Sequence, residues 1–392
     1  MKFDKLKNLM DNLVTDGLAP GNSITVHYGG EKVFEYSAGV SDIESGRKMV
    51  GDEYFRMYSC SKITTVVAAL QLVESGAMLL TDPLYDYIPE YREKYIKRED
   101  GELVKATRHI TVKNLFNMTA GLKYEKDTPG IHRARELTGG KMDTDVVARC
   151  MGSDPIYFEP GDRFHYSMCH DVLAGLVSII TGKKFRDYVK ENIFDPLGMS
   201  SCTYHYTPDL EPKMATQYRF DADEGNITDM VEAQKYGRYK SGKFVRVGFK
   251  TPFEMGENYD SGGAGIISTV DDYAKLAAAL ANRGMGLTGE RILSSGGVEL
   301  LRTNTLDAHQ IRTFDWPQLA GYGYGLGVRT LIDKAAGGSI GNLGEFGWGG
   351  AAGASVYIDA DIGLSAVYAK HVLNPREEYY QPRVRNALYA CI

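Results

Sequence analysis

Strand-like segments stand at the two ends of this chain, and helical segments fill its middle. Alternating apolar and polar side chains, or short runs rich in Gly, Val and Tyr, mark the strands at 23–28, 32–36, 322–328, 354–358 and 364–368. Strands from both ends can share one sheet only if the chain folds back on itself. The pattern therefore predicts one discontinuous α/β domain, residues 1–80 and 256–392, interrupted by a mainly helical domain with long loops at 81–255.

Helical periodicity dominates the middle of the chain and recurs beside the strands. It predicts helices at 3–18, 64–73, 111–120, 144–151, 168–180, 185–194, 271–283 and 380–389. Thr111 is a suitable N-cap and Gly121 a suitable C-cap for the third of these. The helix at 64–73 is apolar almost all round, which predicts burial on most sides. Between residues 81 and 260 clear strand alternation is scarce.

Charge and cysteine usage limit the classes of partner. The 392 residues carry a net charge of -6, which argues against nucleic acid or an anionic membrane as the main partner. The five cysteines are dispersed without C-x-x-C spacing, and the start of the chain lacks an apolar leader. No apolar run approaches the ~18 residues of a membrane span. We therefore expect reduced thiols, a cytoplasmic location and no membrane partner, while the oligomeric state stays open.

Several common site motifs are absent from the sequence. The eight histidines include no H-E-x-x-H motif and no helical pair four residues apart, so no metal site is expected. The chain also lacks a G-x-x-x-x-G-K-[ST] loop, a dinucleotide-type G-x-G-x-x-G and a G-x-S-x-G elbow. These absences predict that the protein uses no cofactor.

The S-x-x-K pattern occurs twice, and its context separates the two. Ser45 and Lys48 lie in a polar segment with no helix behind them, whereas Ser59 and Lys62 directly precede the apolar helix at 64–73. Residues three apart share a helix face, so Lys62 can reach Ser59. Burial would favour the uncharged amine, which can accept the serine proton. The alternative is a structural Ser at a helix start beside a solvated Lys.

Two further segments could complete a site. Pro160-Gly161 leads through Tyr166 into the helix at 168–180, where a phenol can relay protons in a cleft. The segment 346–353 contains Trp348, Gly349 and Gly350, and glycine at this density lets a backbone approach a ligand and offer N–H groups. Each segment could instead be structural, Tyr166 as one packed tyrosine among 26 and 346–353 as a strained hairpin.

In this order the three segments resemble the motifs of the serine β-lactamase and penicillin-binding-protein superfamily. The resemblance extends to Asp195-Pro196-Leu197-Gly198-Met199 and to the stretch from Ser261-Gly262-Gly263 to Tyr273, and so spans most of the chain. It is nearest to the class C branch and the related family VIII carboxylesterases. The implied fold is α+β and β-lactamase/transpeptidase-like, an antiparallel sheet flanked by helices with an inserted, mainly helical domain.

The resemblance also implies roles for individual residues. Ser59 would attack a carbonyl carbon and form an acyl-enzyme, with Lys62 and Tyr166 as base and proton relay. The backbone N–H groups of Ser59 and Ala351 would form the oxyanion hole. Trp348, Gly349 and Gly350 would bind the substrate, a small-molecule ester or amide.

Two positions depart from the commonest pattern of that superfamily. Met168 stands where the second motif usually ends in Asn, and a thioether cannot replace the amide's hydrogen bonds. Trp348 stands where a Lys or His helps β-lactamases and D,D-peptidases bind a carboxylate. Both departures favour a carboxylesterase acting on small to medium acyl esters. The alternatives are a β-lactamase or D-amino-acid-type peptidase or amidase, and a non-catalytic binding protein that retains the cleft.

Overall fold

The helices and strands follow the order expected from the sequence. The computed structural model describes residues 1–222, 242–373 and 376–392. The α-helices are α1 (Asp4–Thr15), α2 (Ser61–Glu74), α3 (Val112–Phe116), α4 (Pro129–Leu137), α5 (Thr144–Met151), α6 (Cys169–Thr181), α7 (Phe185–Val189), α8 (Asp195–Leu197), α10 (Val270–Ala281), α11 (Ser295–Arg302), α12 (Lys334–Gly337) and α13 (Glu377–Tyr389). The strands are β1 (Gly21–Tyr28), β2 (Glu31–Asp42), β3 (Arg47–Lys48), β4 (Tyr54–Arg56), β5 (Tyr95–Lys97), β6 (Leu103–Lys105), β7 (Gln217–Ala222), β8 (Gly242–Gly248), β9 (Ile267–Thr269), β10 (Tyr322–Tyr324), β11 (Arg329–Leu331), β12 (Phe346–Gly347), β13 (Ser355–Asp359), β14 (Leu364–Ala369) and β15 (Val372–Leu373).

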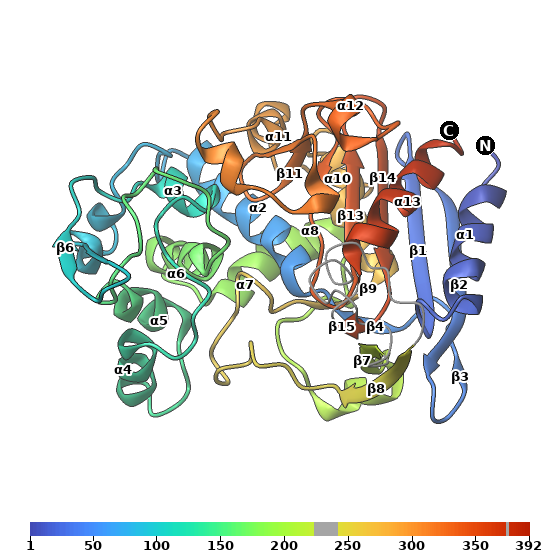
Figure 1. Cartoon of the computed structure of the whole chain (residues 1–392), viewed down its shortest axis with the longest axis horizontal. Coiled ribbons are helices and arrows are strands. Elements are labelled where there is room, and N and C mark those ends of the chain that lie inside the picture. Colours follow the sequence, from blue (N-terminus) through green and yellow to red (C-terminus); the bar gives the residue numbers. More distant parts are fainter. Residues whose placement is uncertain (223–241, 374–375) are drawn as a thin grey trace.

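One antiparallel sheet joins the two ends of the chain (Figure 1). Its 8 strands run in the order β10-β11-β12-β13-β14-β1-β2-β3, and Val26 of β1 stands opposite Ala366 of β14. The predicted α+β arrangement, an antiparallel sheet built from both ends of the chain, is thereby confirmed. We propose the division at residues 80/81 and 255/256 as the domain boundaries of this arrangement.

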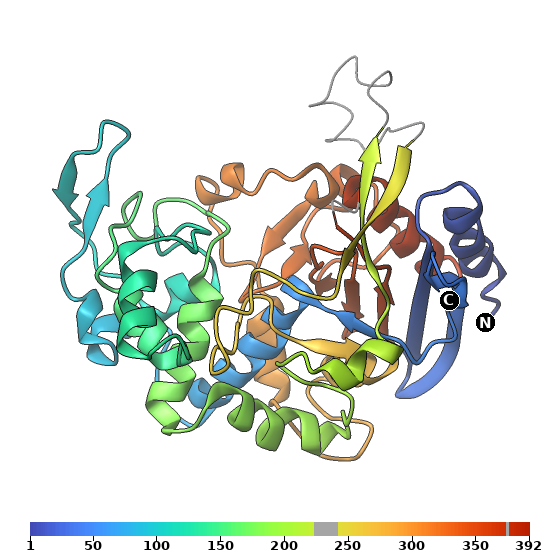
Figure 2. The same cartoon turned by 90° about the horizontal axis from the view of Figure 1, so that it is seen from below.

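Helices cover both faces of the sheet. Side chains alternate along β13, so Tyr357 packs with α1 and α13 while Val356 and Ile358 join the larger core on the opposite face. Helix α10 packs on β14, β1 and β13. Helix α2 lies between the sheet and the helices α3 to α7 (Figures 1 and 2), and its residues 61–70 are all buried. The predicted burial of this apolar helix is confirmed.

Three details differ from the sequence prediction. Helix α3 ends at Phe116 rather than at residue 120, because the side chains of Asn114, Asn117 and Thr119 hydrogen-bond to one another and Met118 adopts a φ of +60°. Gly121 is therefore not its C-cap. The strand expected at 322–328 stops at Tyr324, where a turn begins. The middle region contains two hairpins, β5–β6 and β7–β8.

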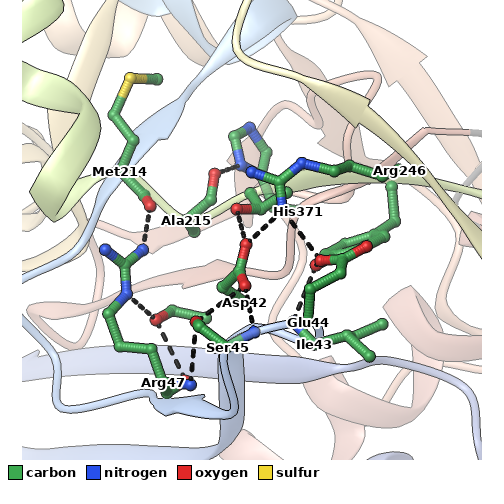
Figure 3. A network of polar contacts seen from close by, with 12 residues as sticks. Asp42, Ile43, Glu44, Ser45, Arg47, Met214, Ala215, Arg246 and His371 are labelled. Carbon is green, nitrogen blue, oxygen red and sulfur yellow. Dashed lines mark hydrogen bonds and ion pairs between the residues drawn. The ribbon is translucent and has the colours of Figure 1, made fainter.

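A polar network fastens the β7–β8 hairpin to the edge of the large sheet (Figure 3). The Asp42 carboxylate accepts hydrogen bonds from Thr216 Oγ1 and Arg246 Nη1, both at 2.6 Å. Arg47 donates to the carbonyl oxygens of Pro212 and Met214. Because Gln217, the first residue of β7, directly follows Thr216, this network fixes a residue that hydrogen-bonds to Tyr58.

Two expectations from the sequence concern membrane-spanning helices and the redox state of the cysteines. Within the described ranges, no helix combines the length and the apolar character needed to cross a bilayer. All five cysteines fall in these ranges and are free, and Cys202 alone is partly exposed.

Candidate active site

Ser59 lies on a sharp turn between β4 and α2. Tyr58, the residue before it, adopts a φ of +45°, a left-handed conformation that is strained for a bulky side chain. A 3₁₀ turn at Tyr58–Cys60 then leads into α2. Ser59 is partly exposed while Tyr58 and Cys60 are buried, so the turn presents one hydroxyl to solvent.

The strained turn is held from the β7–β8 hairpin. The Tyr58 hydroxyl donates a hydrogen bond to Gln217 Oε1, and Gln217 Nε2 donates to the Gly248 carbonyl at 2.8 Å. Such strain persists only where the surroundings fix it. The hairpin therefore acts as a support for the Ser59 turn.

Lys62 is placed to exchange a proton with Ser59. It is fully buried, and its Nζ lies 3.3 Å from Ser59 Oγ and 2.8 Å from the carbonyl oxygen of Gly263. Among the described residues, no carboxylate forms an ion pair with it. As a free amine, Lys62 can donate to Gly263 and accept the Ser59 proton.

Tyr166 covers Lys62 with its aromatic ring. The centre of the ring lies 4.6 Å from Lys62 Nζ, between the stacked rings of Tyr124 at 5.6 Å and Trp348 at 5.7 Å. Trp348 Nε1 also donates a hydrogen bond to the Tyr166 hydroxyl oxygen at 3.3 Å. These contacts fix the position of the Tyr166 phenol.

A buried carboxylate stands behind Lys62 that sequence reasoning missed. Asp171, on α6, accepts hydrogen bonds from Tyr259 at 2.8 Å, Ser261 at 2.7 Å and the Gly263 N–H at 3.4 Å. Burial and the neighbouring Asp171 carboxylate raise the pKa of Tyr259 well above its usual value, so its hydroxyl stays a donor. The network positions the Gly263 carbonyl that Lys62 contacts.

Residues 348–351 form the opposite wall of the site. Gly350 lies so close to the Ser59 turn that a Cβ there would sit 2.3 Å from the Met57 carbonyl oxygen. Its own N–H donates to Ala354 at 2.8 Å. This approach brings Ala351 to the pocket that Ser59 also lines. The two predicted oxyanion-hole residues therefore face one cavity.

That cavity has a volume of about 180 Å³. It is lined by Ser59, Tyr166, Trp316, Gln318, Leu319, Arg329, Trp348, Gly349, Ala351, Glu377 and Gln381. The structure thus brings Ser59, Tyr166, Trp348, Gly349 and Ala351 together, with Lys62 directly beneath. Gly350 borders the pocket through the backbone contact just described.

Met168 does not line the pocket. Its side chain is 1% exposed and belongs to the main hydrophobic core at the start of α6. The loss of an amide at this position therefore leaves an apolar packing contact rather than a gap in the site.

Sequence reasoning also missed the far end of the pocket. Trp316, Gln318, Arg329, Glu377 and Gln381 belong to no motif. One signal was available, since the chain contains only two tryptophans and both line this pocket.

Two further features of the described part of the chain concern Cys60 and clusters of metal-ligating side chains. Complete burial raises the pKa of the Cys60 thiol far above its usual range, so it is no competing nucleophile. No cluster of three or more metal-ligating side chains occurs among the residues that the structure describes.

Comparison with known proteins identifies the family of the chain. The profile of the family described as Beta-lactamase matches residues 6–389. This chain belongs to the β-lactamase family. It is a serine hydrolase of that family. Its relatives include esterases and homologues of penicillin-binding proteins.

Two proteins are similar in sequence to this β-lactamase-family hydrolase over most of its length. Protein Rv1367c of Mycobacterium tuberculosis is 30% identical over 363 residues, which cover 90% of this chain and 86% of that protein. Esterase EstB of Burkholderia gladioli is 29% identical over 376 residues, covering 93% and 88%.

Two solved structures share the fold. EstCE1, a hydrolase with promiscuous acyltransferase activity, superposes with a TM-score of 0.76 at 22% identity, covering 98% of this chain and 97% of that one. A family VIII carboxylesterase gives a TM-score of 0.72 at 19% identity, covering 100% and 97%.

Proposed function

We propose that this serine hydrolase is a carboxylesterase that cleaves small to medium acyl esters through an acyl-enzyme. The observation that carries the proposal is the contact of Lys62 Nζ with Ser59 Oγ at 3.3 Å beneath the Tyr166 ring. The esterase names among the relatives, EstB and the family VIII carboxylesterase, support the choice of reaction. The free cysteines favour a reducing, cytoplasmic location.

The first half-reaction transfers the acyl group to Ser59. Lys62 takes the Ser59 proton as Oγ attacks the ester carbonyl carbon, and the N–H groups of Ser59 and Ala351 stabilise the oxyanion. As the C–O bond to the alcohol breaks, Tyr166 donates a proton to the departing oxygen and is reprotonated from Lys62. The products of this half are the alcohol and acyl-Ser59.

The second half-reaction releases the acid. A water molecule gives a proton to the Tyr166–Lys62 pair and attacks the acyl carbon. The ester bond to Ser59 Oγ then breaks, Oγ regains its proton from Lys62, and the carboxylic acid leaves. Neither half requires a metal or a cofactor.

The pocket favours an ester over a substrate that bears a carboxylate. Trp348 presents an indole where related enzymes hold a cation, and Arg329 is already paired with Glu345 at 2.9 Å. A free carboxylate would therefore find no unpaired cation among the pocket-lining residues that the structure describes.

The decisive test is Ser59→Ala measured on an aryl ester, with Cys60→Ala as the matched control. We expect Ser59→Ala to lose activity by about 10³-fold or more, and the control to retain it. A fluorophosphonate probe should label Ser59 in the wild type. Undiminished ester hydrolysis by Ser59→Ala would refute the proposal, and a lack of labelling would favour a binding protein.

A panel of substrates distinguishes the carboxylesterase from the remaining alternative, a β-lactamase or a D-amino-acid-type peptidase. We expect turnover of the aryl ester to exceed that of a chromogenic cephalosporin and of a D-alanyl amide. Faster turnover of either amide would identify a β-lactamase or a D-amino-acid-type peptidase instead.

A further inference from the structure

The pocket at Ser59 contains one carboxyl group that the reaction does not use. Glu377 lies in the first turn of α13 and lines the same cavity as Ser59. A Cβ on Gly349 would sit 3.2 Å from Glu377 Oε1, so this oxygen lies directly against the strand edge beside the site. A substrate group that extends from Ser59 along residues 348–350 therefore meets Glu377.

Glu377 has few partners of its own. Its one hydrogen bond among the described residues comes from Gln318 Nε2, at a long 3.4 Å, and no described cation lies within ion-pair distance. A carboxyl group that is partly buried and weakly bonded gains from a donor or a cation supplied by a ligand.

Arg329 also lines the pocket, but its charge is already balanced. Its guanidinium donates to Glu345 Oε1 at 2.9 Å, and both side chains are buried, with exposed fractions of 3% and 0%. It also lies over the rings of Tyr322 and Tyr357. The charge available to a ligand in this pocket is therefore the negative charge of Glu377.

The walls of the pocket are aromatic. Trp316 and Trp348 meet edge to face at 6.0 Å, and Tyr166 contacts both rings. Aromatic faces attract cations, and most strongly when they are desolvated. The volume of about 180 Å³ is below the usual range for drug-sized ligands and suits one small group.

We propose that the pocket selects esters that carry a small ammonium group, with Glu377 as its counter-charge and Trp316 and Trp348 as its walls. This inference rests on the proposed esterase function and specifies its substrate class. The geometry gives the reason, because one incompletely paired carboxyl and several aromatic rings line a cavity that opens on Ser59.

The charge state of Glu377 provides a second readout. Burial, with the adjacent Glu378 carboxylate, raises the pKa of Glu377 to about 7, against the opposing charges of Lys370 and Arg329. Burial lowers the pKa of Lys370 well below its usual value, and Cys60 stays protonated. As Glu377 loses its proton near neutral pH, selectivity for a cation should rise between pH 6 and pH 8, and loss of this rise in Glu377→Gln separates it from any titration of Lys370.

The test compares isosteric esters that differ only in charge. Acetylcholine and 3,3-dimethylbutyl acetate place the group in the alcohol. Phenyl 4-(trimethylammonio)butanoate and phenyl 5,5-dimethylhexanoate place it in the acyl part. We expect kcat/KM for the cation to exceed that for its neutral partner by about tenfold in at least one pair. Equal values in both pairs would overturn the proposal while leaving the esterase assignment intact.

Variants then identify the residue responsible. Glu377→Gln should bring the ratio of cationic to neutral kcat/KM close to one and remove its pH dependence. Glu378→Gln, which makes the same charge change one residue away, should keep the preference. A preference that survives Glu377→Gln would also overturn the proposal. The wild-type comparison needs no variant, so it decides the question even if a variant fails to fold.

Discussion

At the Ser59 end of the pocket, separate segments of the chain fix each reacting group, whereas at the Glu377 end a carboxyl is held by one long hydrogen bond among the described residues. Lys62 contacts Ser59 and Gly263, and Tyr166 stacks between two rings. From the residues that the structure describes, Glu377 receives one hydrogen bond, at 3.4 Å from Gln318. Packing therefore fixes the positions of the reacting groups, whereas a substitution at the Glu377 end, which we propose selects the substrate, should cost little stability.

The largest effect should come from breaking the tightly held end at Lys62. Lys62→Met keeps the length of the side chain but removes the proton acceptor, so kcat on an aryl ester should fall by about 10²–10⁴-fold. Lys126→Met is the matched control, since Lys126 also lies on an aromatic ring, 4.2 Å from the centre of Phe253. An equal loss in both variants would show that the effect is not specific to Lys62.

Tyr166→Phe should give the next largest loss. The phenol oxygen accepts a hydrogen bond from Trp348 and is our proposed proton donor to the alcohol, so kcat should fall by about 10–100-fold with little change in KM. Tyr124→Phe removes a hydroxyl from the ring stacked on the other face and should stay within about threefold of the wild type. Steady-state kinetics on one ester would reveal whether only KM changes, which would contradict the assigned role.

Substitutions at two neighbouring glycines test the two ends of the pocket separately. A Cβ at Gly350 meets the Met57 backbone carbonyl at 2.3 Å, whereas a Cβ at Gly349 meets the end of the flexible Gln381 side chain at 2.6 Å. We expect Gly350→Ala to lower kcat/KM on a neutral ester by about tenfold or more and to lower Tm, since backbone must move. Gly349→Ala should mainly alter the preference between charged and neutral esters. The reverse order of effects would contradict this comparison.

The smallest effect on catalysis is expected far from either end, at Asp42. Partial burial raises the pKa of Asp42, but hydrogen bonds from Thr216, Ser45 and Arg246 outweigh burial and hold it well below its usual value. The ionised group therefore stabilises the fold above about pH 4, and this contribution is lost as the pH falls further. Asp42→Asn should lower the free energy of unfolding by about 1–2 kcal/mol at pH 7.

Urea denaturation at pH 7 and pH 3.5 would measure this difference, which should shrink at the lower pH. Asp221→Asn is the control, because the exposed pair of Asp221 with Arg219 should contribute no measurable stability. Equal losses in the two variants, or a difference that grows in acid, would contradict the assigned role of the network.

The sequence motifs predicted residues at the Ser59 end of the pocket but none of those at the Glu377 end. The spacing of Ser59 and Lys62 ahead of a buried helix, and the glycines beside Trp348, are local patterns that follow from helix geometry and backbone freedom. Glu377, Gln318 and Arg329 come from three separate segments that share no motif or periodicity. They meet only because of the strand order of the sheet, which no local pattern encodes.

Secondary structure shows the same division. The longer periodic helices were predicted closely, since α6 spans Cys169–Thr181 where residues 168–180 were expected. Errors arose where side-chain hydrogen bonds replaced the backbone ladder, as after Phe116, or where short hairpins carry little alternation, as in β5–β6. Local competition of this kind overrides the average tendency of a segment.

The hydrogen bond between Tyr58 and Gln217 also bears on the stage of folding at which activity is gained. The two partners are 159 positions apart, and the Lys62 contact with Gly263 spans 201 positions. Contacts of such range close late in folding, because the entropy of the intervening loops must be overcome first. A chain released before its last strands pair would have helices but no aligned nucleophile. Ester turnover should therefore regain its full value only with the slowest refolding phase, which makes activity a direct count of completely folded molecules.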